Sequence, residues 1–404
     1  MSTYDDETVA LCALNKIFGY RPRLGLELME HAGSALALFG ASRPGWSGQA
    51  GGSSQAELLD QLVPASLEWG RRELERVREG GFRFLGITDP DYPEPLRSCE
   101  DPPLGLYLNG CTSPTEIFGM RPLVAFVGTR DVSPYGREWC QRLVSALAEA
   151  AVQPVIVSGL AFGVDGIAHK TALDCGLPTV GAMATGIEKI YPYRHEALAA
   201  RMVETPGCGL VTDYPMGTDP VALNFLRRNR IIAGLVSAVV VVESKTKGGS
   251  LMTAKYACNY SRDVYAVPGR LDDVRSAGCN SLIASDMARI VASPEQLVDA
   301  LGLGGPRRHR GAGGSWVTSQ AGDPPEKVLQ ALLTRRYGPG SAPVTVGLAV
   351  LQHRGSTAEE LAAAVQLPYS QVLSATLTLE ADGFLTTDLL QRCSLAGPVA
   401  GKLF

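Results

Sequence analysis

The chain has 404 residues, of which 45% are hydrophobic, and a formal net charge of −4 at pH 7. This length favours two or three domains, and the mild acidity excludes a polycation that coats nucleic acid indiscriminately, so any nucleic-acid site must be local. No apolar run approaches the roughly 18 residues of a membrane span.

The first residues and the cysteines indicate the compartment. Residues 1–7 are acidic and lack the basic start and apolar run of a signal peptide, which predicts a cytoplasmic protein with no membrane partner. The nine cysteines are scattered without a C-x-x-C pair, which argues against a disulfide framework or a zinc site. We therefore expect neither a metal nor a cofactor.

Residues 1–84 have a helical pattern and are predicted to form a small domain of the SAM or helix-hairpin-helix kind. Apolar periodicity predicts helices at Thr8–Phe18, Leu24–Ala37 and Ser66–Glu79. A helix pair around a short turn can contact DNA backbone, but simple packing is the favoured interpretation. The Gly- and Ser-rich segment Gly40–Ser54 is predicted to be a flexible loop in this domain.

Residues 85–301 alternate apolar, β-rich runs with amphipathic helical stretches. The strands are predicted at Leu123–Val127, Pro154–Val157, Thr179–Ala182, Leu210–Thr212, Ala238–Glu243 and Val264–Val267. Apolar strands separated by helices indicate an α/β fold, a Rossmann-like doubly wound sheet that is mostly parallel. The Gly-, Pro- and Arg-rich residues 302–325 then form a linker to a domain at 326–404.

Glycine follows several of these strands, where backbone amides at a sheet edge can approach a ligand. The segments are Gly128-Thr129-Arg130, Ser158-Gly159, Gly248-Gly249-Ser250 with Thr253 one turn on, and a helix start near Asn280. Glycine is also the ordinary turn residue of α/β proteins, but several such ends together favour an anion site at helix N-termini.

The type of anion is narrowed by what the motifs lack. There is no G-x-G-x-x-G followed by an acid and no G-x-x-x-x-G-K-[ST], so dinucleotide binding and a Walker-type ATPase are poorly supported. The run Asn224-Phe225-Leu226-Arg227-Arg228-Asn229-Arg230 instead places guanidinium forks around an aromatic side chain. Such a run can also be a solvated helix face with Phe225 in the core, but with Arg130 it favours a polynucleotide.

Other polar residues receive structural interpretations. Asp165 and His169 are four residues apart but lack a third metal ligand, and His195 lacks a nucleophile partner. We expect no catalytic residue, although Asp213 and Glu243 near strand ends leave a carboxylate pair for hydrolysis open.

Taken together, these motifs resemble the DNA-processing protein A (DprA/Smf) family between about residues 85 and 292. The resemblance is carried by Val127-Gly128-Thr129-Arg130, Ser158-Gly159-Leu160-Ala161, Tyr191-Pro192, Arg228-Asn229-Arg230-Ile231-Ile232, Gly249-Ser250-Leu251-Met252-Thr253 and Ala266-Val267-Pro268-Gly269.

The resemblance implies a non-enzymatic protein that binds and protects single-stranded DNA during natural transformation and loads RecA recombinase onto it. It also implies a homodimer through the Rossmann-like domain, with single-strand-binding protein as a further partner. With the residues singled out above, the predicted DNA site is Gly128, Thr129, Arg130, Ser158, Gly159, Asn224, Phe225, Arg227, Arg228, Asn229, Arg230, Lys245, Gly248, Gly249, Ser250, Thr253 and Asn280.

The chain departs from the family pattern at four positions. Thr129 and Gly248 replace common serines, Asp213 replaces a glutamate, and Ala222 replaces a frequent lysine. The last change removes a positive charge, which Arg227 or Lys245 is expected to supply.

The C-terminal segment predicts helices at Glu326–Arg335, Ala358–Val365 and Ser370–Ala381, with Ser356 and Glu359 as a capping box. This spacing indicates a winged-helix-like domain. The predicted recognition helix has no Lys or Arg, so protein contact or packing is favoured over reading of a DNA groove.

The sequence also suggests two alternatives to DNA binding. A nucleotide-processing Rossmann hydrolase, similar to phosphoribohydrolases, needs a glutamate just after the glycine loop, and residues 248–256 contain no acid. A helix-turn-helix regulator with the core as ligand sensor is disfavoured by the uncharged recognition helix.

Overall fold

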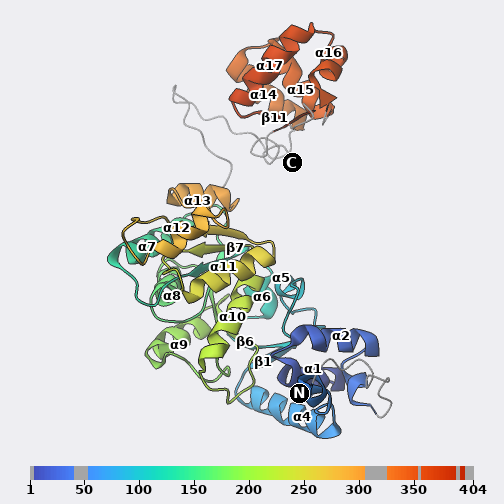
Figure 1. The fold of residues 1–404 in the computed structure, drawn as a ribbon, viewed down its shortest axis with the longest axis vertical. Helices are drawn as coiled ribbons and strands as arrows, with labels where there is room; N and C mark the ends of the chain where they lie inside the picture. The colour runs from blue at the N-terminus through green and yellow to red at the C-terminus, as the bar shows by residue number, and fades with distance from the viewer. Residues whose placement is uncertain (1–3, 41–52, 305–324, 354–355, 388–391, 396–404) are drawn as a thin grey trace. The chain divides into compact units, whose positions relative to one another are not determined.

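The computed structural model describes residues 4–40, 53–304, 325–353, 356–387 and 392–395. The chain divides into two compact units, residues 1–306 and 307–404, which are described separately (Figure 1). None of the described helices is long and apolar enough to cross a bilayer.

The first unit is built on a nine-stranded sheet of order β1-β2-β6-β5-β4-β3-β7-β8-β9. Neighbours from β6 to β9 are parallel, β2 is antiparallel to β6, and β1 is antiparallel to β2. The strands are β1 (Arg83–Gly86), β2 (Gly105–Asn109), β3 (Leu123–Val127), β4 (Val155–Ser158), β5 (Thr179–Ala182), β6 (Gly209–Thr212), β7 (Ala238–Val241), β8 (Asp263–Ala266) and β9 (Arg289–Ile290). The predicted α/β class with a mostly parallel sheet is confirmed, while β1, β2 and β9 were not predicted.

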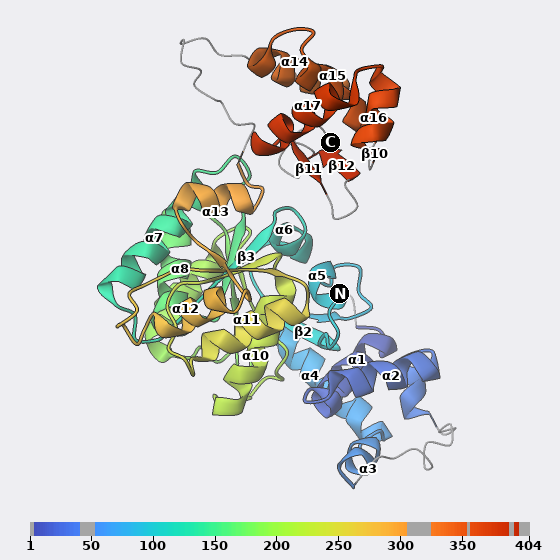
Figure 2. The same cartoon turned by 45° about the horizontal axis from the view of Figure 1, so that its top comes forward.

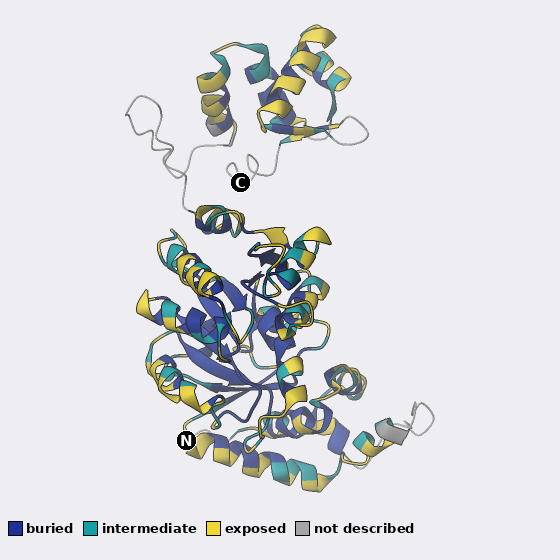
Figure 3. Ribbon diagram, turned by 60° about the vertical axis from the view of Figure 1, so that its left-hand side comes forward, coloured by how far each residue is buried: buried dark blue, intermediate teal, exposed yellow. Residues whose placement is uncertain are grey.

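Helices cover both faces of this sheet, which explains why its strands are apolar throughout. Along β3, Leu123, Ala125 and Val127 pack into one core, and Val124 and Phe126 into the other. The first core is completed by α10 (Ala222–Leu235), α11 (Gly249–Asn259) and α12 (Ala277–Ala284), and the second by α7 (Pro134–Ala148), α8 (Val164–Asp174) and α13 (Pro294–Ala300). Figure 3 shows the buried strands between helices whose outer sides are exposed.

Short helices connect the remaining strands. They are α5 (Glu94–Arg97), α6 (Pro114–Phe118), the 3-10 helix η3 (Tyr193–His195) and α9 (Glu196–Glu204). The last two follow β5 and bring exposed side chains to the same sheet edge as the glycine loops, because parallel strands end on one side.

The N-terminal helices lie beside the edge of the sheet, and the first and last of them contact β1 (Figure 2). They are α1 (Asp6–Phe18), α2 (Pro22–Ala32), η1 (Leu36–Phe39), α3 (Ser53–Leu59) and α4 (Pro64–Glu79). The predicted helix Leu24–Ala37 was wrong in extent, because Gly33 adopts a left-handed φ of 81° and ends α2. Asn15 joins α1 to the sheet by donating to the Asp213 carbonyl at 2.8 Å and accepting from the Gly105 amide at 3.1 Å.

The predicted domain boundary, loop and linker can be compared with the structure only in part. The boundary placed at residue 84 falls inside β1, whose strand pairing continues into the sheet. Most of the predicted loop at 40–54 and of the predicted linker at 302–325 lies outside the described residues.

The described residues of the second unit form four helices and a three-stranded antiparallel sheet of order β10-β12-β11. Its elements are α14 (Pro325–Tyr337), α15 (Ala342–Gln352), β10 (Ser356–Thr357), α16 (Ala358–Val365), α17 (Tyr369–Ala381), β11 (Leu385–Thr387) and β12 (Arg392–Leu395). The predicted capping box was wrong by one residue, since Thr357 and Glu360 form it. The winged-helix assignment stays a prediction.

Candidate nucleic-acid interface

A pocket of about 630 Å³ opens at the carboxyl ends of β3 and β7. From β3 the chain crosses to β4 on one side, and it later returns to β7 on the other, so the pocket lies at the topological switch point of the sheet. This is where doubly wound sheets bind ligands.

One wall of the pocket is the loop that follows β3. A Cβ on Gly128 would lie 2.5 Å from Cγ2 of Val164, so glycine permits the close approach of α8. The Thr129 amide donates to the Glu243 carbonyl at 2.8 Å, and the Ser133 amide donates to the Glu243 carboxylate at 2.9 Å. The buried Glu243 thereby fixes the loop that presents Arg130.

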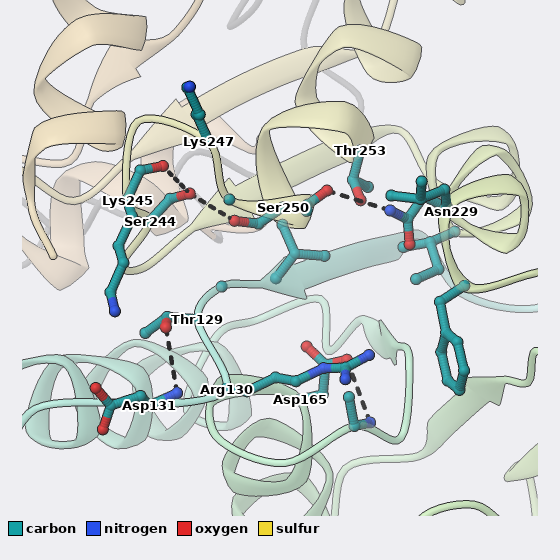
Figure 4. A pocket seen from close by; sticks show the side chains of 18 of the residues that line it. Thr129, Arg130, Asp131, Asp165, Asn229, Ser244, Lys245, Lys247, Ser250 and Thr253 are labelled. Atoms are coloured by element: carbon teal, nitrogen blue, oxygen red, sulfur yellow. Dashed lines mark hydrogen bonds between the residues drawn. The ribbon is translucent and has the colours of Figure 1, made fainter. Parts of the chain in front are cut away.

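The opposite wall is the N-terminus of α11. Its cap residue Gly248 offers no side-chain hydrogen bond, so the first amides of α11 face the pocket with the positive end of the helix dipole. Ser250 lies at this end and donates from Oγ to Oγ of Ser244 at 2.8 Å. In Figure 4, Ser250, Thr253 and Asn229 lie across the pocket from Arg130 and Asp165.

The third contribution comes from α10, which packs beside α11. Asn229 donates from Nδ2 to the Gly249 carbonyl at 3.2 Å and so joins the two helices (Figure 4). The Arg130 guanidinium carbon lies 5.1 Å from the centroid of the half-buried Phe225 ring, a cation–π contact that spans the pocket.

The charges that line the pocket are mostly positive. Arg130, Lys245 and Lys247 are exposed and free to meet solvent or a ligand. Asp131 also lines the pocket, but it forms an ion pair with Arg275 at 3.3 Å. An anion with several charged groups therefore suits this surface.

A buried pair forms the floor of the pocket. Burial raises the pKa of the Asp165 carboxyl, and the Arg228 guanidinium is the main influence that lowers it again. Burial likewise lowers the pKa of Arg228, which donates to the Gly159 carbonyl at 2.6 Å. Arg228 thus faces the pocket while its guanidinium is held by Asp165 and the Gly159 carbonyl.

Comparison with known proteins shows to which family the chain belongs. The family model for DNA recombination-mediator protein A matches residues 83–302, which is more than half of the chain. The chain belongs to this family. Within this DNA recombination-mediator protein A family, it is 38% identical to Protein Smf of Synechocystis over 230 residues, which are 57% of this chain and 56% of that one. The chain thus spans little more than half the length of this relative.

Two further relatives agree with this assignment. DNA processing protein DprA of Bacillus subtilis is 35% identical over 57% of this chain and 75% of its own. The crystal structure of DNA processing protein A from Streptococcus pneumoniae superposes with a TM-score of 0.58 at 27% identity, covering 74% of this chain and 98% of that one. The resemblance predicted from the sequence motifs is confirmed.

The pocket gathers most of the residues that the sequence predicted for DNA binding. Three separate segments supply them: Gly128, Thr129, Arg130, Phe225, Arg228, Asn229, Lys245, Gly248, Gly249, Ser250 and Thr253. The lining also includes Lys247, which the prediction missed although it directly precedes the glycine loop. Of the two residues expected to supply the charge missing at Ala222, Lys245 lines the pocket and Arg227 does not.

Three predicted residues of α10 lie outside the pocket lining, because other protein groups use their polar atoms. Arg230 is 4% exposed and forms a buried ion pair with Asp213 at 2.8 Å. Arg227 stacks on the Tyr20 ring at 3.9 Å, and Asn224 accepts from the Tyr20 hydroxyl at 2.9 Å. These contacts join α10 to the N-terminal helices and correct the expectation that the whole run faces the ligand.

The other three residues outside the lining also have structural contacts. The Ser158 hydroxyl donates to the Phe126 carbonyl at 2.6 Å, and the Gly159 carbonyl accepts from the buried arginine of α10. Asn280 accepts from the Gly269 amide at 3.1 Å and donates to its carbonyl at 3.0 Å. Each of these bonds shapes a loop near the sheet edge.

The histidines hold loops and strands. Nδ1 of His169 contacts the Thr179 hydroxyl at 2.7 Å, and burial lowers the pKa of His169 to about 3. Nδ1 of His195 contacts the Leu160 carbonyl at 2.9 Å. Among the residues that the structure describes, no group of three His, Cys, Asp or Glu side chains could hold a metal ion.

Proposed function

We propose that the pocket at the switch point binds single-stranded DNA and that the protein acts in recombination as a DNA-binding factor. The observation that carries this is the convergence of exposed cations, the amides of α11 and the Phe225 ring on one pocket. Cations and amides match phosphate oxygens, and an aromatic face matches an unpaired base. Duplex bases already stack on one another, so the ring favours single strands.

We propose no catalytic role for the pocket carboxylates. Asp131 pairs with Arg275, and Asp165 is buried at the floor of the pocket beside Arg228. The carboxylate pair considered from the sequence is also engaged, Asp213 by Arg230 and Glu243 by the loop after β3. These contacts support a binding function over the nucleotide hydrolase.

Membership of the family supports further roles for the whole protein. We propose that it protects incoming DNA during natural transformation, that it loads RecA with single-strand-binding protein as a second partner, and that it forms a homodimer through the Rossmann-like unit. Light scattering gives the oligomeric state. RecA-dependent ATP hydrolysis on DNA coated with single-strand-binding protein tests the loading.

The salt dependence of binding tests the pocket itself. A triple variant, Arg130→Ala with Lys245→Ala and Lys247→Ala, removes exposed charges without opening the core. Each phosphate contact contributes about 0.7 to the slope of log K against log salt for single strands, so the slope should shrink by about 2. Arg228 is left intact because its removal would strand the Asp165 carboxyl.

The matched control is Arg201→Ala, which removes an exposed arginine of α9 that pairs with Asp174 of α8 at 2.7 Å. It should bind single strands as the unchanged protein does. An unchanged slope in the triple variant, or equal affinity for duplex DNA, would contradict the proposed site. Release of free base from nucleoside monophosphates would support the hydrolase instead.

A further inference from the structure

We propose that an exposed aromatic ledge beside the pocket continues the DNA path and stacks the nucleotides that leave the pocket. The ledge consists of Phe162, Tyr191 and Tyr193, with Arg194 as its cation. This inference rests on the proposed function and adds a second, separable part to that site. It lies at the carboxyl ends of β4 and β5, next to the strand ends that form the pocket.

The ledge is continuous with the pocket through two contacts. The Tyr191 ring centroid lies 5.4 Å from that of Phe225, which lines the pocket. Phe162 directly follows Ala161, another lining residue, and its ring meets His195 at 5.1 Å. A strand held at Phe225 therefore meets this surface on leaving the pocket.

The segments that carry the ledge are held in place. His195 bonds through Nδ1 to the Leu160 carbonyl at 2.9 Å, which connects the chain after β5 to the loop after β4. A Cβ on Gly166 would lie 2.7 Å from Cε1 of His195, so the imidazole packs closely against α8. The aromatic side chains thus project from a supported backbone, which lowers the entropy lost on binding.

The exposure of these rings is what needs an explanation. Tyr193 is 75% exposed, Tyr191 46% and Phe162 42%, although large aromatic side chains usually bury most of their surface. Arg194 is exposed as well, and within the described residues it makes no hydrogen bond or ion pair. Two exposed tyrosines followed by an unpaired arginine offer stacking faces and a phosphate ligand in one short segment.

The pocket is too small to hold all the nucleotides of a bound single strand. At about 630 Å³ it falls in the range of a site for one small molecule, whereas proteins that bind single strands usually contact several nucleotides. The pocket holds a short part of the strand, and the neighbouring bases need other stacking partners. The ledge supplies aromatic faces where the strand emerges.

The experiment compares oligothymidylates of two lengths on the full chain. The variant is Tyr193→Ala with Arg194→Gln, because neither side chain lines the pocket or contacts Phe225. By fluorescence anisotropy, binding of an oligomer of about 16 nucleotides should weaken by about tenfold, since each stacked base contributes 5- to 150-fold. Binding of an oligomer of about four nucleotides should change less than about twofold, because it fits the pocket alone.

The conservative pair Tyr193→Trp with Arg194→Lys serves as the rescue control. It should restore binding of the long oligomer, and stacking should quench the new indole fluorescence with the long oligomer but not with the short one. Unchanged affinity of the Tyr193→Ala, Arg194→Gln variant for the long oligomer overturns the ledge, and the exposed rings then belong to a protein contact. An equal loss at both lengths overturns it too, because the residues would then act through the pocket.

The proposed pocket can fail separately from the ledge. If the unchanged protein does not bind the short oligomer, or if Arg130→Ala with Lys245→Ala and Lys247→Ala binds it normally, the proposed function fails. If the triple variant weakens binding of both oligomers and the Tyr193→Ala, Arg194→Gln variant weakens binding of neither, the pocket stands and only the ledge is wrong.

Discussion

Gly249 offers the sharpest single test of the anion site, because the unliganded fold does not need a glycine there. A Cβ built on Gly249 meets no atom within 4 Å, and the residue has no left-handed φ. Among the described glycines it alone combines open space with a backbone conformation that any residue adopts. Gly249→Ala should therefore fold normally, and the higher helix propensity of alanine can raise the free energy of unfolding by up to about 1 kcal/mol.

Binding should respond in the opposite direction. A methyl group at the first residue of α11 occupies the space through which a phosphate reaches the helix amides. Losing one charge-assisted hydrogen bond costs about 1.5–3 kcal/mol, so the Kd for single-stranded DNA should rise by about 10- to 150-fold. Fluorescence anisotropy at fixed salt measures the Kd, and thermal unfolding monitors the fold.

Gly248→Ala is the matched comparison one residue earlier. Its Cβ would lie 2.3 Å from Oγ of Ser244 and 3.1 Å from the Lys245 carbonyl, so this loop must shift. We expect lower stability as well as weaker binding. The reasoning is refuted if Gly249→Ala retains its stability and binds single strands within about twofold of the unchanged protein, because phosphate would then not approach these amides.

Three further substitutions test the surroundings of the pocket. The folded-state pKa of His169 is lowered to about 3 from 6.5, so its stabilising contribution is complete above pH 6.5 and is lost as pH falls toward 3. Urea unfolding between pH 6 and 4 should therefore lose about 1.4 kcal/mol per pH unit from this group, and His169→Gln should remove that slope. Asp213→Asn leaves the buried Arg230 with Asp101, at 3.5 Å, as its remaining carboxylate partner and should lower the free energy of unfolding by about 1.5–3 kcal/mol, an idea refuted by an unchanged urea midpoint. Arg227→Ala loses its stacking on Tyr20 and should cost about 1 kcal/mol of stability in the same assay, while the Kd for single strands stays unchanged; a large rise in Kd would return Arg227 to the binding surface.

The central strands could be predicted from the sequence because burial on both faces leaves a plain signal. Residues of β3, β4 and β7 are apolar on both sides of the sheet, and helical stretches separate them. β9 has only two residues, both exposed, and β1 has only Phe84 and Leu85 as apolar residues between an arginine and a glycine, so neither gives a clear apolar run. The helix Ala342–Gln352 was missed because it is apolar around most of its circumference and rich in valine, which hides the helical period.

The predicted DNA-binding residues coincide with the pocket lining only in part, and the reason lies in the geometry of α10. Consecutive residues on a helix point about 100° apart, so the run from 224 to 230 could not present all of its side chains to one ligand. The residues of α10 that line the pocket are Phe225, Leu226, Arg228, Asn229 and Ile232, and all but Leu226 follow the i, i+3, i+4, i+7 pattern of one helix face.

That pattern is visible in the sequence, whereas the predicted DNA site takes residues 224–230 as a single charged block. Arg227 and Arg230 fall on other faces of α10, where one packs on an N-terminal tyrosine and the other pairs with Asp213. The sequence could not reveal these partners, because they lie far away in the chain. The density of arginine in this run therefore reflects two positions: one face of α10 lines the pocket, and the other faces attach the helix to the N-terminal helices and the sheet.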